Sequence, residues 1–257
     1  MQTVRLFSGT SAPGVYNGIC MESLWGLKRV AQHSLPTSVI TECSSIELHP
    51  EKWESAKHSL LIFPGGKCSV WDESVSEKQR KRIIHYVEEN GGRLIGICAG
   101  AYWWTEHSRY ESRQKTRKFS LCSWECKGPI FPEIAVVEII WMQTLKKVNV
   151  LVNLGGEFMP RCGKIQDSEE IEVLALYTER NTAAIIRSRR GKGEAILSGP
   201  HLELGSTDLE PLKKGFPHLA EKFQDMQKML EATDGLRLKY LHSCFNLETA
   251  VRDAKLA

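Results

Sequence analysis

The sequence has no long hydrophobic run and little net charge, and both absences limit its class. No segment approaches the roughly 18 consecutive apolar residues of a membrane-spanning helix, and the first residues lack the apolar centre of a signal peptide. The formal net charge is +3 over 257 residues, which is too small to indicate nucleic-acid binding. We therefore expect neither a membrane nor a nucleic acid as a partner.

Closely spaced cysteines are also scarce. The eight cysteines lie at positions 20, 43, 68, 98, 122, 126, 162 and 244. Only Cys122 and Cys126 are close to one another, and no second pair at zinc-binding spacing accompanies them. The pattern predicts no metal site, and it favours a reduced, cytoplasmic protein whose thiols are mostly buried.

Basic residues gather in two short stretches, at 109–118 and 187–192. Both stretches have turn-forming or acidic neighbours, so we interpret them as solvated surface. The chain contains no internal repeat or low-complexity segment, and its length suits one large domain or a domain with a tail.

In the first hundred residues, short apolar runs alternate with helical patterns. The runs at 4–7, 37–40, 59–63 and 94–97 have the length and composition of buried strands. Helical apolar spacing covers 21–33 and 76–90, and Gly91 and Gly92 provide a stop for the second helix. This alternation predicts an α/β fold with a parallel sheet covered on both faces.

After about residue 119 the pattern changes. Short runs at 148–152, 173–177, 183–186 and 195–197 predict strands joined by hairpins, with a turn at 189–193. From residue 209 the chain shows helical spacing without a glycine- or proline-rich linker. We expect one domain at 1–208 and a helical C-terminal tail at 209–257 that packs on it. The apolar stripe of the tail comprises Leu219, Phe223, Met226, Met229 and Leu230.

The sequence Gly-Ile-Cys-Ala-Gly at 96–100 has the form of a nucleophile elbow, a sharp turn between a strand and a helix. Small residues two positions before and after Cys98 allow such a turn. The start of the following helix favours a thiolate and offers the backbone N–H of Ala99 to a developing oxyanion. A buried structural cysteine between packing glycines explains these five residues about equally well.

Two further motifs end neighbouring apolar runs. Gly65 and Gly66 follow the run at 59–63, and glycines there permit the close backbone approach that an oxyanion hole requires. His201 and Glu203 follow the run at 195–197, and this spacing can place imidazole and carboxylate side by side. A lone histidine before a leucine is more often structural. The three motifs together favour a triad of Cys98, His201 and Glu203.

The same segments carry a resemblance to a known family. Phe-Pro-Gly-Gly at 63–66, Gly-Ile-Cys-Ala-Gly-Ala-Tyr at 96–102 and Leu-Ser-Gly-Pro-His-Leu-Glu at 197–203 resemble the class I glutamine amidotransferase-like superfamily. Within it, the chain is most similar to the N-terminal domain of eukaryotic biotin–protein ligases and of stand-alone bacterial proteins. The segment at 152–158 resembles that family's Asn-Gly-Gly segment, and the loop at 8–11 is a weaker match. The resemblance implies a flavodoxin-like three-layer sandwich with a mostly parallel central sheet.

The resemblance also implies residue roles. Cys98 would be the nucleophile, His201 the general base and Glu203 the partner that orients the base. Backbone N–H groups of Ala99, Gly66 and Lys67 would form the oxyanion hole. The implied substrate pocket comprises Gly65, Tyr102, Asn153, Gly155 and Gly156. No cofactor and no metal are implied.

One departure from the family bears on the substrate. Glutaminases of this superfamily carry a glutamine shortly after the elbow glycine, whereas this chain has Ala-Tyr-Trp-Trp at 101–104. We therefore expect a small-molecule or amide substrate other than glutamine. Biotin ligation is not expected, because the surrounding catalytic domain of a biotin ligase is absent.

Three functions compete on this basis. The leading hypothesis is a cysteine-dependent amide or ester hydrolase or acyl transferase. The first alternative is a non-catalytic binding or regulatory module that keeps the fold and has a protein partner. The second is a thiol-based redox or glyoxalase-like protein, which needs no His-x-Glu pair and is disfavoured by its presence.

Overall fold

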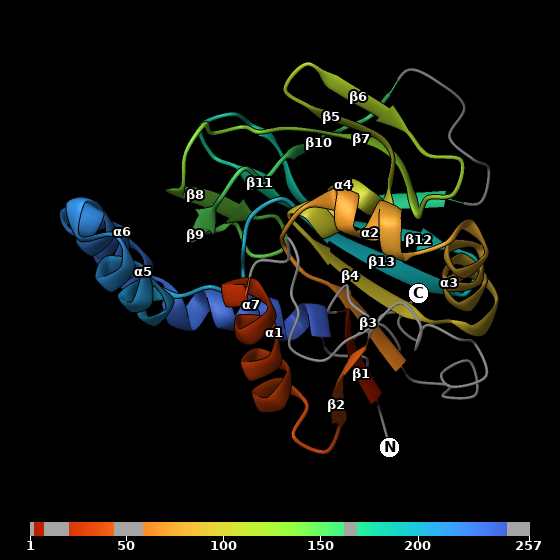
Figure 1. Ribbon diagram of the computed structural model, residues 1–257, viewed down its shortest axis with the longest axis horizontal. Helices are drawn as coiled ribbons and strands as arrows, with labels where there is room; N and C mark the ends of the chain where they lie inside the picture. The colour runs from red at the N-terminus through yellow and green to blue at the C-terminus, as the bar shows by residue number, and fades with distance from the viewer. Residues whose placement is uncertain (1–2, 8–20, 44–58, 162–168, 246–257) are drawn as a thin grey trace.

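The computed structural model describes residues 3–7, 21–43, 59–161 and 169–245. Five parallel strands form the centre of its sheet (Figure 1). In spatial order they are β2 (Val39–Cys43), β1 (Thr3–Phe7), β3 (Ser59–Phe63), β4 (Arg93–Ile97) and β13 (Gly193–Ser198). All five overlap apolar runs that were predicted to be strands, and those predictions are confirmed.

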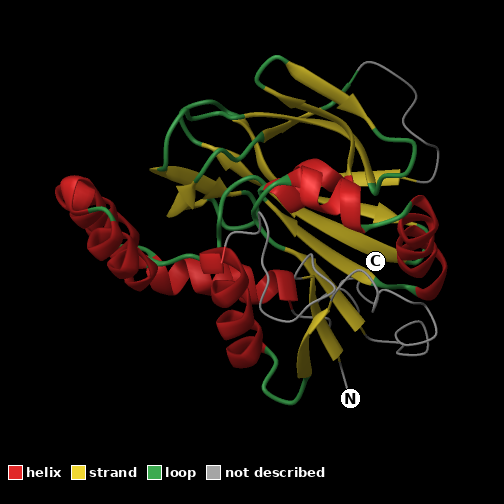
Figure 2. Cartoon of the chain, viewed as in Figure 1, coloured by secondary structure: helices red, strands yellow, loops and turns green. Residues whose placement is uncertain are grey.

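Helices cover both faces of this sheet, as Figure 2 shows. Side chains of α1 (Met21–Ser34) and α7 (Asp234–Phe245) share one buried hydrophobic cluster with the central strands. Side chains of α2 (Cys68–Ser74), α3 (Glu77–Asn90) and α4 (Ala99–Trp104) share the other. The fold is therefore the expected α/β sandwich of three layers with a mostly parallel central sheet.

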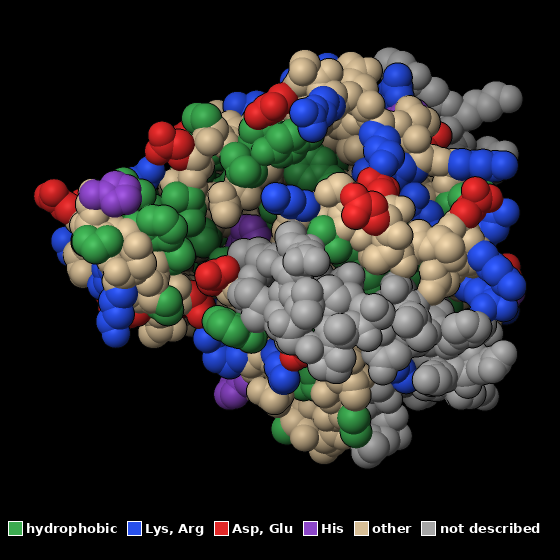
Figure 3. All heavy atoms as spheres, viewed as in Figure 1, with side chains coloured by type: hydrophobic (Ala, Val, Ile, Leu, Met, Phe, Trp, Pro, Cys, Tyr) green, Lys and Arg blue, Asp and Glu red, His purple; other side chains and the backbone are tan. Residues whose placement is uncertain are grey.

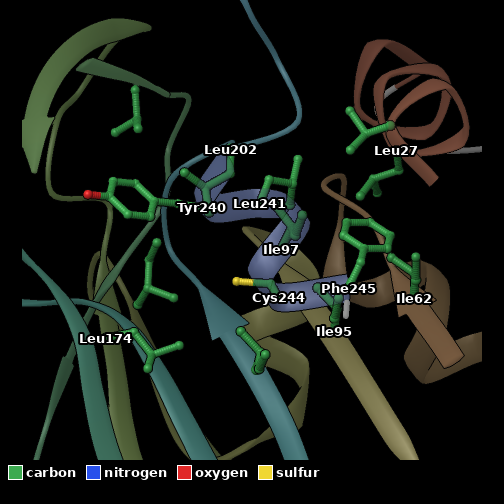
Figure 4. Close-up of a cluster of buried hydrophobic side chains, with 14 of the residues drawn as sticks. Leu27, Ile62, Ile95, Ile97, Leu174, Leu202, Tyr240, Leu241, Cys244 and Phe245 are labelled. Carbon is green, nitrogen blue, oxygen red and sulfur yellow. The ribbon is translucent and has the colours of Figure 1, made fainter. Parts of the chain in front are cut away.

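Alternation along each strand divides its side chains between the two hydrophobic layers. On β3, Leu60 and Ile62 belong to the α1 layer, whereas Leu61 and Phe63 belong to the α3 layer. Figure 4 shows the α1 layer, where side chains from the sheet meet those of α1 and α7. Both faces of the strand are buried, which explains why its sequence is a continuous apolar run.

The predicted helix at 76–90 is confirmed as α3, and its ends follow from local chemistry. The Ser76 hydroxyl accepts a hydrogen bond from the Gln79 amide at 3.3 Å, and the Gln79 side chain accepts one from the Ser76 amide at 2.8 Å. Gly91 ends the helix at a φ of 69°, where a glycine avoids steric strain.

Further strands, most of them paired antiparallel, extend the sheet beyond β13. The hairpin between β12 (Thr182–Arg190) and β13 turns at Gly191, whose φ is 58°, as the sequence predicted. From β12 the sheet continues through β10, β7, β5 and β6, and a branch runs through β11, β8 and β9. These strands are β5 (Thr105–Tyr110), β6 (Arg113–Thr116), β7 (Cys122–Gly128), β8 (Ala135–Trp141), β9 (Lys146–Val152), β10 (Glu157–Met159) and β11 (Glu169–Tyr177).

Five of these strands were not predicted from the sequence, and the predicted change of pattern lies too late in the chain. The added strands begin at Thr105 rather than near residue 119, because helix α4 has only six residues. The first of them, β5, pairs antiparallel with β6 and parallel with β7. Polar residues dominate β5, β6 and β7, and all four residues of β6 are exposed. β8 has an apolar run without strict alternation, and β10 has only three residues.

The described part of the C-terminal tail is helical. It contains α5 (Glu210–Gly215), α6 (Ala220–Glu231) and α7, with short 3₁₀ turns at Ser206–Leu209 and Pro217–Leu219. Buried side chains of α6 form a cluster with residues from β9 and from the segment after β13. Its members are Leu151, Leu204, Leu209, Phe223, Met226 and Leu230. Met229 does not belong to this stripe, because 46% of its surface is exposed.

Substitutions in α6 test whether the tail stabilises the domain. Leu230→Ala removes a side chain that is 0% exposed, so we expect the free energy of unfolding to fall by about 2–5 kcal/mol. The neighbouring Met229→Ala is the matched control and should change it by less than about 0.5 kcal/mol. Urea denaturation measures both. Equal, small effects would mean that the tail does not contribute to the stability of the domain.

Candidate active site

Cys98 occupies a strained turn between β4 and α4. Its φ of 50° and ψ of −111° lie outside the regions that non-glycine residues normally adopt. A Cβ at Gly96 would lie 2.8 Å from the carbonyl oxygen of Gly100, and one at Gly100 would lie 2.2 Å from that of Phe63. The Cys98 amide donates to the Ser198 carbonyl at 2.8 Å. The turn therefore needs both glycines, and β13 holds it in place.

The ends of three neighbouring strands meet at this turn. β3, β4 and β13 are adjacent and parallel, so their carboxyl ends lie at the same edge of the sheet. Residues 64–67 follow β3, Cys98 follows β4 and residues 199–203 follow β13. The topology of the sheet thus brings the three sequence motifs together.

A buried histidine and a buried glutamate lie beside the thiol. The Nδ1 atom of His201 is 2.6 Å from Oε1 of Glu203, and their exposed fractions are 2% and 0%. The His201 amide donates to the Leu151 carbonyl at 2.8 Å, which ties this residue to β9. Since Nδ1 faces the carboxylate, the other ring nitrogen, Nε2, is free to act toward a substrate or toward Cys98.

Electrostatics favour a protonated His201. Burial by itself lowers the pKa of the ring, but the negative charge of Glu203 and hydrogen bonds with Cys98 and Glu203 outweigh it. The net effect raises the pKa of His201 well above its usual value. A protonated His201 places a positive charge beside the sulfur of Cys98.

Ser23, on helix α1, is a site residue that the sequence analysis missed. Its hydroxyl donates to Oε1 of Glu203 at 2.5 Å and accepts a hydrogen bond from the Gly65 amide at 3.0 Å. Ser23 is 0% exposed, and it lies on the same helical face as Leu27 and Val30. A serine on that apolar face was the signal available in the sequence. Ser23 connects the carboxylate of the candidate triad to the loop after β3.

This contact changes the expected role of the loop after β3. Because the Gly65 amide is bonded to Ser23, it does not face the pocket. Its lack of a side chain is nevertheless required, since a Cβ at Gly65 would lie 2.5 Å from Cε1 of His201. Gly66 has a φ of 149°, which favours glycine. As the first residue of α4, Ala99 has no acceptor for its N–H within the helix, and Lys67 immediately precedes α2.

The segment at 153–156 closes one side of the thiol. The Sγ atom of Cys98 lies 3.4 Å from the carbonyl oxygen of Asn153, whose side chain is exposed. The Tyr102 hydroxyl donates to the Leu154 carbonyl at 3.3 Å. A second tyrosine that the sequence did not reveal, Tyr177, donates to the Gly156 carbonyl at 3.1 Å. Two buried phenols therefore hold this loop against the elbow.

Buried contacts also explain the glycines of this segment and assign them a supporting role. A Cβ at Gly156 would lie 2.9 Å from the Tyr102 ring, and one at Gly155 would lie 2.2 Å from the Gly199 carbonyl oxygen. Tyr102 is 3% exposed, and burial raises the pKa of its hydroxyl above its usual range. Of the predicted pocket residues, Tyr102, Gly155 and Gly156 thus form the supporting layer, and Asn153 is the exposed member.

Trp103 lies elsewhere. Its ring centroid is 5.5 Å from that of Phe63 and 4.8 Å from that of Trp104, within the α3 layer. Of the aromatic residues after the elbow, Tyr102 therefore lies against the 153–156 loop, whereas Trp103 packs in the α3 layer.

The remaining candidate chemistry is limited in the part of the chain that the structure describes. There, no group of three or more His, Cys, Asp and Glu side chains is arranged to hold a metal ion. In the same residues, no helix is long and apolar enough to span a membrane. Cys20, Cys162 and the loop at 8–11 lie outside the described residues.

Two glutamine amidotransferase crystal structures share the fold over most of their length. One gives a TM-score of 0.52 at 18% identity and covers 88% of this chain and 98% of the other. The second, from Thermotoga maritima, gives 0.54 at 12% identity and covers 95% of both chains. The chain therefore shares the fold of these glutamine amidotransferases.

Sequence comparison identifies the family. The family described as biotin-protein ligase, N terminal, matches residues 11–255, and the chain belongs to it. A biotin–protein ligase of Schizosaccharomyces pombe is 27% identical over 218 residues, which are 75% of this chain and 33% of that protein. An uncharacterized protein of Chlamydia muridarum is 28% identical over 172 residues, which are 61% of this chain and 64% of that protein. The chain thus matches less than two thirds of the length of either relative.

The site geometry predicts which cysteine reacts first. Limiting iodoacetamide at about pH 6.5, well below the pKa of a free thiol, should label Cys98 before the other cysteines, because an imidazolium lies beside it. His201→Ala should slow this labelling by roughly tenfold or more, since it removes the cation. Peptide mass mapping of the folded protein measures both rates.

Cys68 is the internal control for this experiment. It is more exposed than Cys98, but burial raises the pKa of its thiol to about 12. If accessibility alone determined the labelling rate, Cys68 would react first. If the charge beside the thiol determines it, Cys98 reacts first. If several other cysteines were labelled at equal rates and Cys98 were not labelled, Cys98 would be a packing residue.

Proposed function

We propose that this protein is a cysteine-dependent amide or ester hydrolase or acyl transferase, with Cys98 as nucleophile and His201 and Glu203 completing a triad. The observation that carries the proposal is the buried pair of His201 and Glu203, 2.6 Å apart, in contact with a thiol on a strained elbow. A purely structural cysteine requires neither the backbone strain nor a buried, charged neighbour.

In the first step, the Cys98 sulfur attacks the carbonyl carbon of an amide or ester. The new C–S bond forms while the π electrons of the carbonyl move to its oxygen, and the proton of the thiol resides on Nε2 of His201. The N–H groups of Ala99, Gly66 and Lys67 are the donors that we assign to this oxyanion. Glu203 holds Nδ1 and stabilises the imidazolium.

In the second step, His201 gives its proton to the leaving amine or alcohol, and the C–N or C–O bond breaks. A thioester on Cys98 remains. Water, or a second acceptor in an acyl transferase, attacks this thioester while His201 accepts its proton. The acid or the transferred acyl product leaves, and the thiol is restored.

The substrate that we propose is a small molecule or an amide other than glutamine. Tyr102 follows the elbow where glutaminases carry a substrate-holding glutamine, and its hydroxyl is already bonded to the backbone of the 153–156 loop. Biotin ligation is not part of the proposal. The activity in the name of the yeast relative belongs to a protein of which the match covers 33%.

A binding or regulatory module is the second candidate, and one observation favours it. Cys98 is only 6% exposed, and its sulfur contacts the Asn153 carbonyl oxygen. A carbonyl oxygen does not stabilise a thiolate, so a protein in which this contact persists would bind a ligand without reacting.

An activity screen tests the proposal. We expect hydrolysis of some activated esters or anilides in a panel of acyl groups, with a loss of about a thousandfold or more in Cys98→Ala and in His201→Ala. Cys68→Ala, at the neighbouring thiol, is the control and should keep its activity. Glutamine should release no ammonia, and glutamine turnover of about 1 s⁻¹ or more would restore the glutaminase interpretation.

A substitution at Ser23 should reduce the same activity by a smaller factor. Ser23→Ala removes one hydrogen bond to Glu203, so kcat should fall about tenfold with KM nearly unchanged. Ser34→Ala is the matched control, because Ser34 lies on the same helix and its hydroxyl donates only to the Val30 carbonyl at 2.7 Å. Activity that survives in Cys98→Ala would contradict the triad and leave the binding module as the better account.

A further inference from the structure

Two arginine side chains on the α3 face of the sheet lack a carboxylate partner. Arg117 follows β6, is only 4% exposed and donates from Nη1 to the Ser108 hydroxyl at 2.6 Å. Arg80, on α3, lies with its guanidinium carbon 3.8 Å from the ring centroid of Trp103 and donates to the Trp103 carbonyl. Among the described residues, no Asp or Glu oxygen lies within 4.0 Å of either guanidinium, and both Nε atoms are buried without a hydrogen-bond partner.

This arrangement corrects the sequence interpretation of the stretch at 109–118 as solvated surface. Arg117 directly follows β6, which pairs with β5, and its amide and its side chain donate to Glu106 and Ser108 of β5. Figure 3 shows further Lys and Arg side chains gathered over and beside α3 on the right of the view. Lys115 and Arg117 of this stretch, together with Arg80 of α3, are called the basic cluster below.

Among the described residues, Asp72 is the acidic group that pairs with Lys115, and both of its oxygens are already occupied. Oδ1 accepts a hydrogen bond from Nε1 of Trp103 at 3.0 Å, and Oδ2 lies 2.5 Å from Nζ of Lys115. Burial, followed by the charge of Arg117, lowers the pKa of Arg80 to about 10. The charge of Arg117 thus acts unfavourably on Arg80. Asp72 attracts both guanidinium groups but forms its ion pair with Lys115 instead.

Counting charges indicates what would neutralise this cluster. Arg80, Arg117 and Lys115 carry three positive charges and Asp72 carries one negative charge, which leaves +2. A carboxylate carries one negative charge, whereas a phosphate monoester carries about −1.5 to −2 at neutral pH. The planar N–H fork of arginine suits the oxygens of phosphate. Lys115 has half of its side chain exposed, at 50%, and gives the cluster an open side.

We propose that Arg80, Arg117 and Lys115 form a binding site for a phosphate group, either as the free ion or as part of a phosphate monoester. The site is separate from Cys98 but close to its helix, since Cys68 on α2 donates to the Ala99 carbonyl at 3.3 Å. The phosphate site does not depend on the proposed hydrolase function. Catalysis and phosphate binding are therefore tested independently.

Phosphate titration of the folded protein tests the site. Inorganic phosphate should raise the melting temperature above that in sodium chloride of equal ionic strength, and should broaden the ³¹P signal of phosphate in solution with the wild-type protein. Arg80→Gln and Arg117→Gln should each weaken the apparent affinity by at least fivefold. Lys192→Gln, which removes an exposed lysine elsewhere on the surface (72% exposed), should bind like the wild type.

A second arm uses glycerol 3-phosphate to separate the two sources of phosphate. Tighter binding of the monoester than of the free ion assigns the site to a phosphorylated small molecule, and the reverse order assigns it to free phosphate. If a variant fails to fold, the ³¹P measurement on the wild-type protein still shows whether phosphate binds. Equal effects of phosphate and chloride, or unchanged affinity in both arginine variants, would overturn the proposal.

Discussion

The hydrogen bond between Nδ1 of His201 and Oε1 of Glu203 connects the parts of the protein that the site requires. His201 and Glu203 follow β13, while Ser23 reaches Glu203 from α1 and Gly65 reaches Ser23 from the loop after β3. Both members of the pair are buried, so neither can exchange its partner for water. Removing one would leave an uncompensated charge in the interior, which costs about 3–5 kcal/mol.

Backbone strain at Cys98 is the second constraint, and it depends on the same surroundings. A left-handed φ at a non-glycine residue costs on the order of 1–3 kcal/mol and persists only where neighbouring structure enforces it. Here the enforcement comes from the close approach of Gly100 to the Phe63 carbonyl and from the hydrogen bond between Cys98 and Ser198. Burial of both faces of β3 and β4 supplies the rigidity that this arrangement requires.

The fold and the motifs at the strand ends were predictable because they follow from local patterns. Continuous apolar runs identified the parallel strands, Ser76 and Gly91 bounded α3, and small residues flanked Cys98. Parallel strands end at one edge of a sheet, so the order of the motifs along the chain already suggested a common location.

The features that were not predicted from the sequence depend on contacts between distant segments, which no local pattern encodes. Ser23 contacts Glu203 across 180 positions of the chain, and Tyr177 reaches the loop at Gly156 from β11. Strands β5 to β7 carry mostly polar side chains, and β6 is exposed along its whole length, so no apolar run marks them. Arg117 resembled a surface residue, since its burial results from the pairing of β6 with β5.

The protonation state of His201 tests the account most directly. An NMR titration of the ring nitrogens in ¹⁵N-histidine-labelled protein should find His201 protonated well above pH 6.5, the usual midpoint of histidine. Because Glu203 and Cys98 raise the pKa of His201, Glu203→Gln and Cys98→Ala should each move the midpoint downward. A His201 midpoint near 6.5 that responds to neither substitution would contradict the proposed triad.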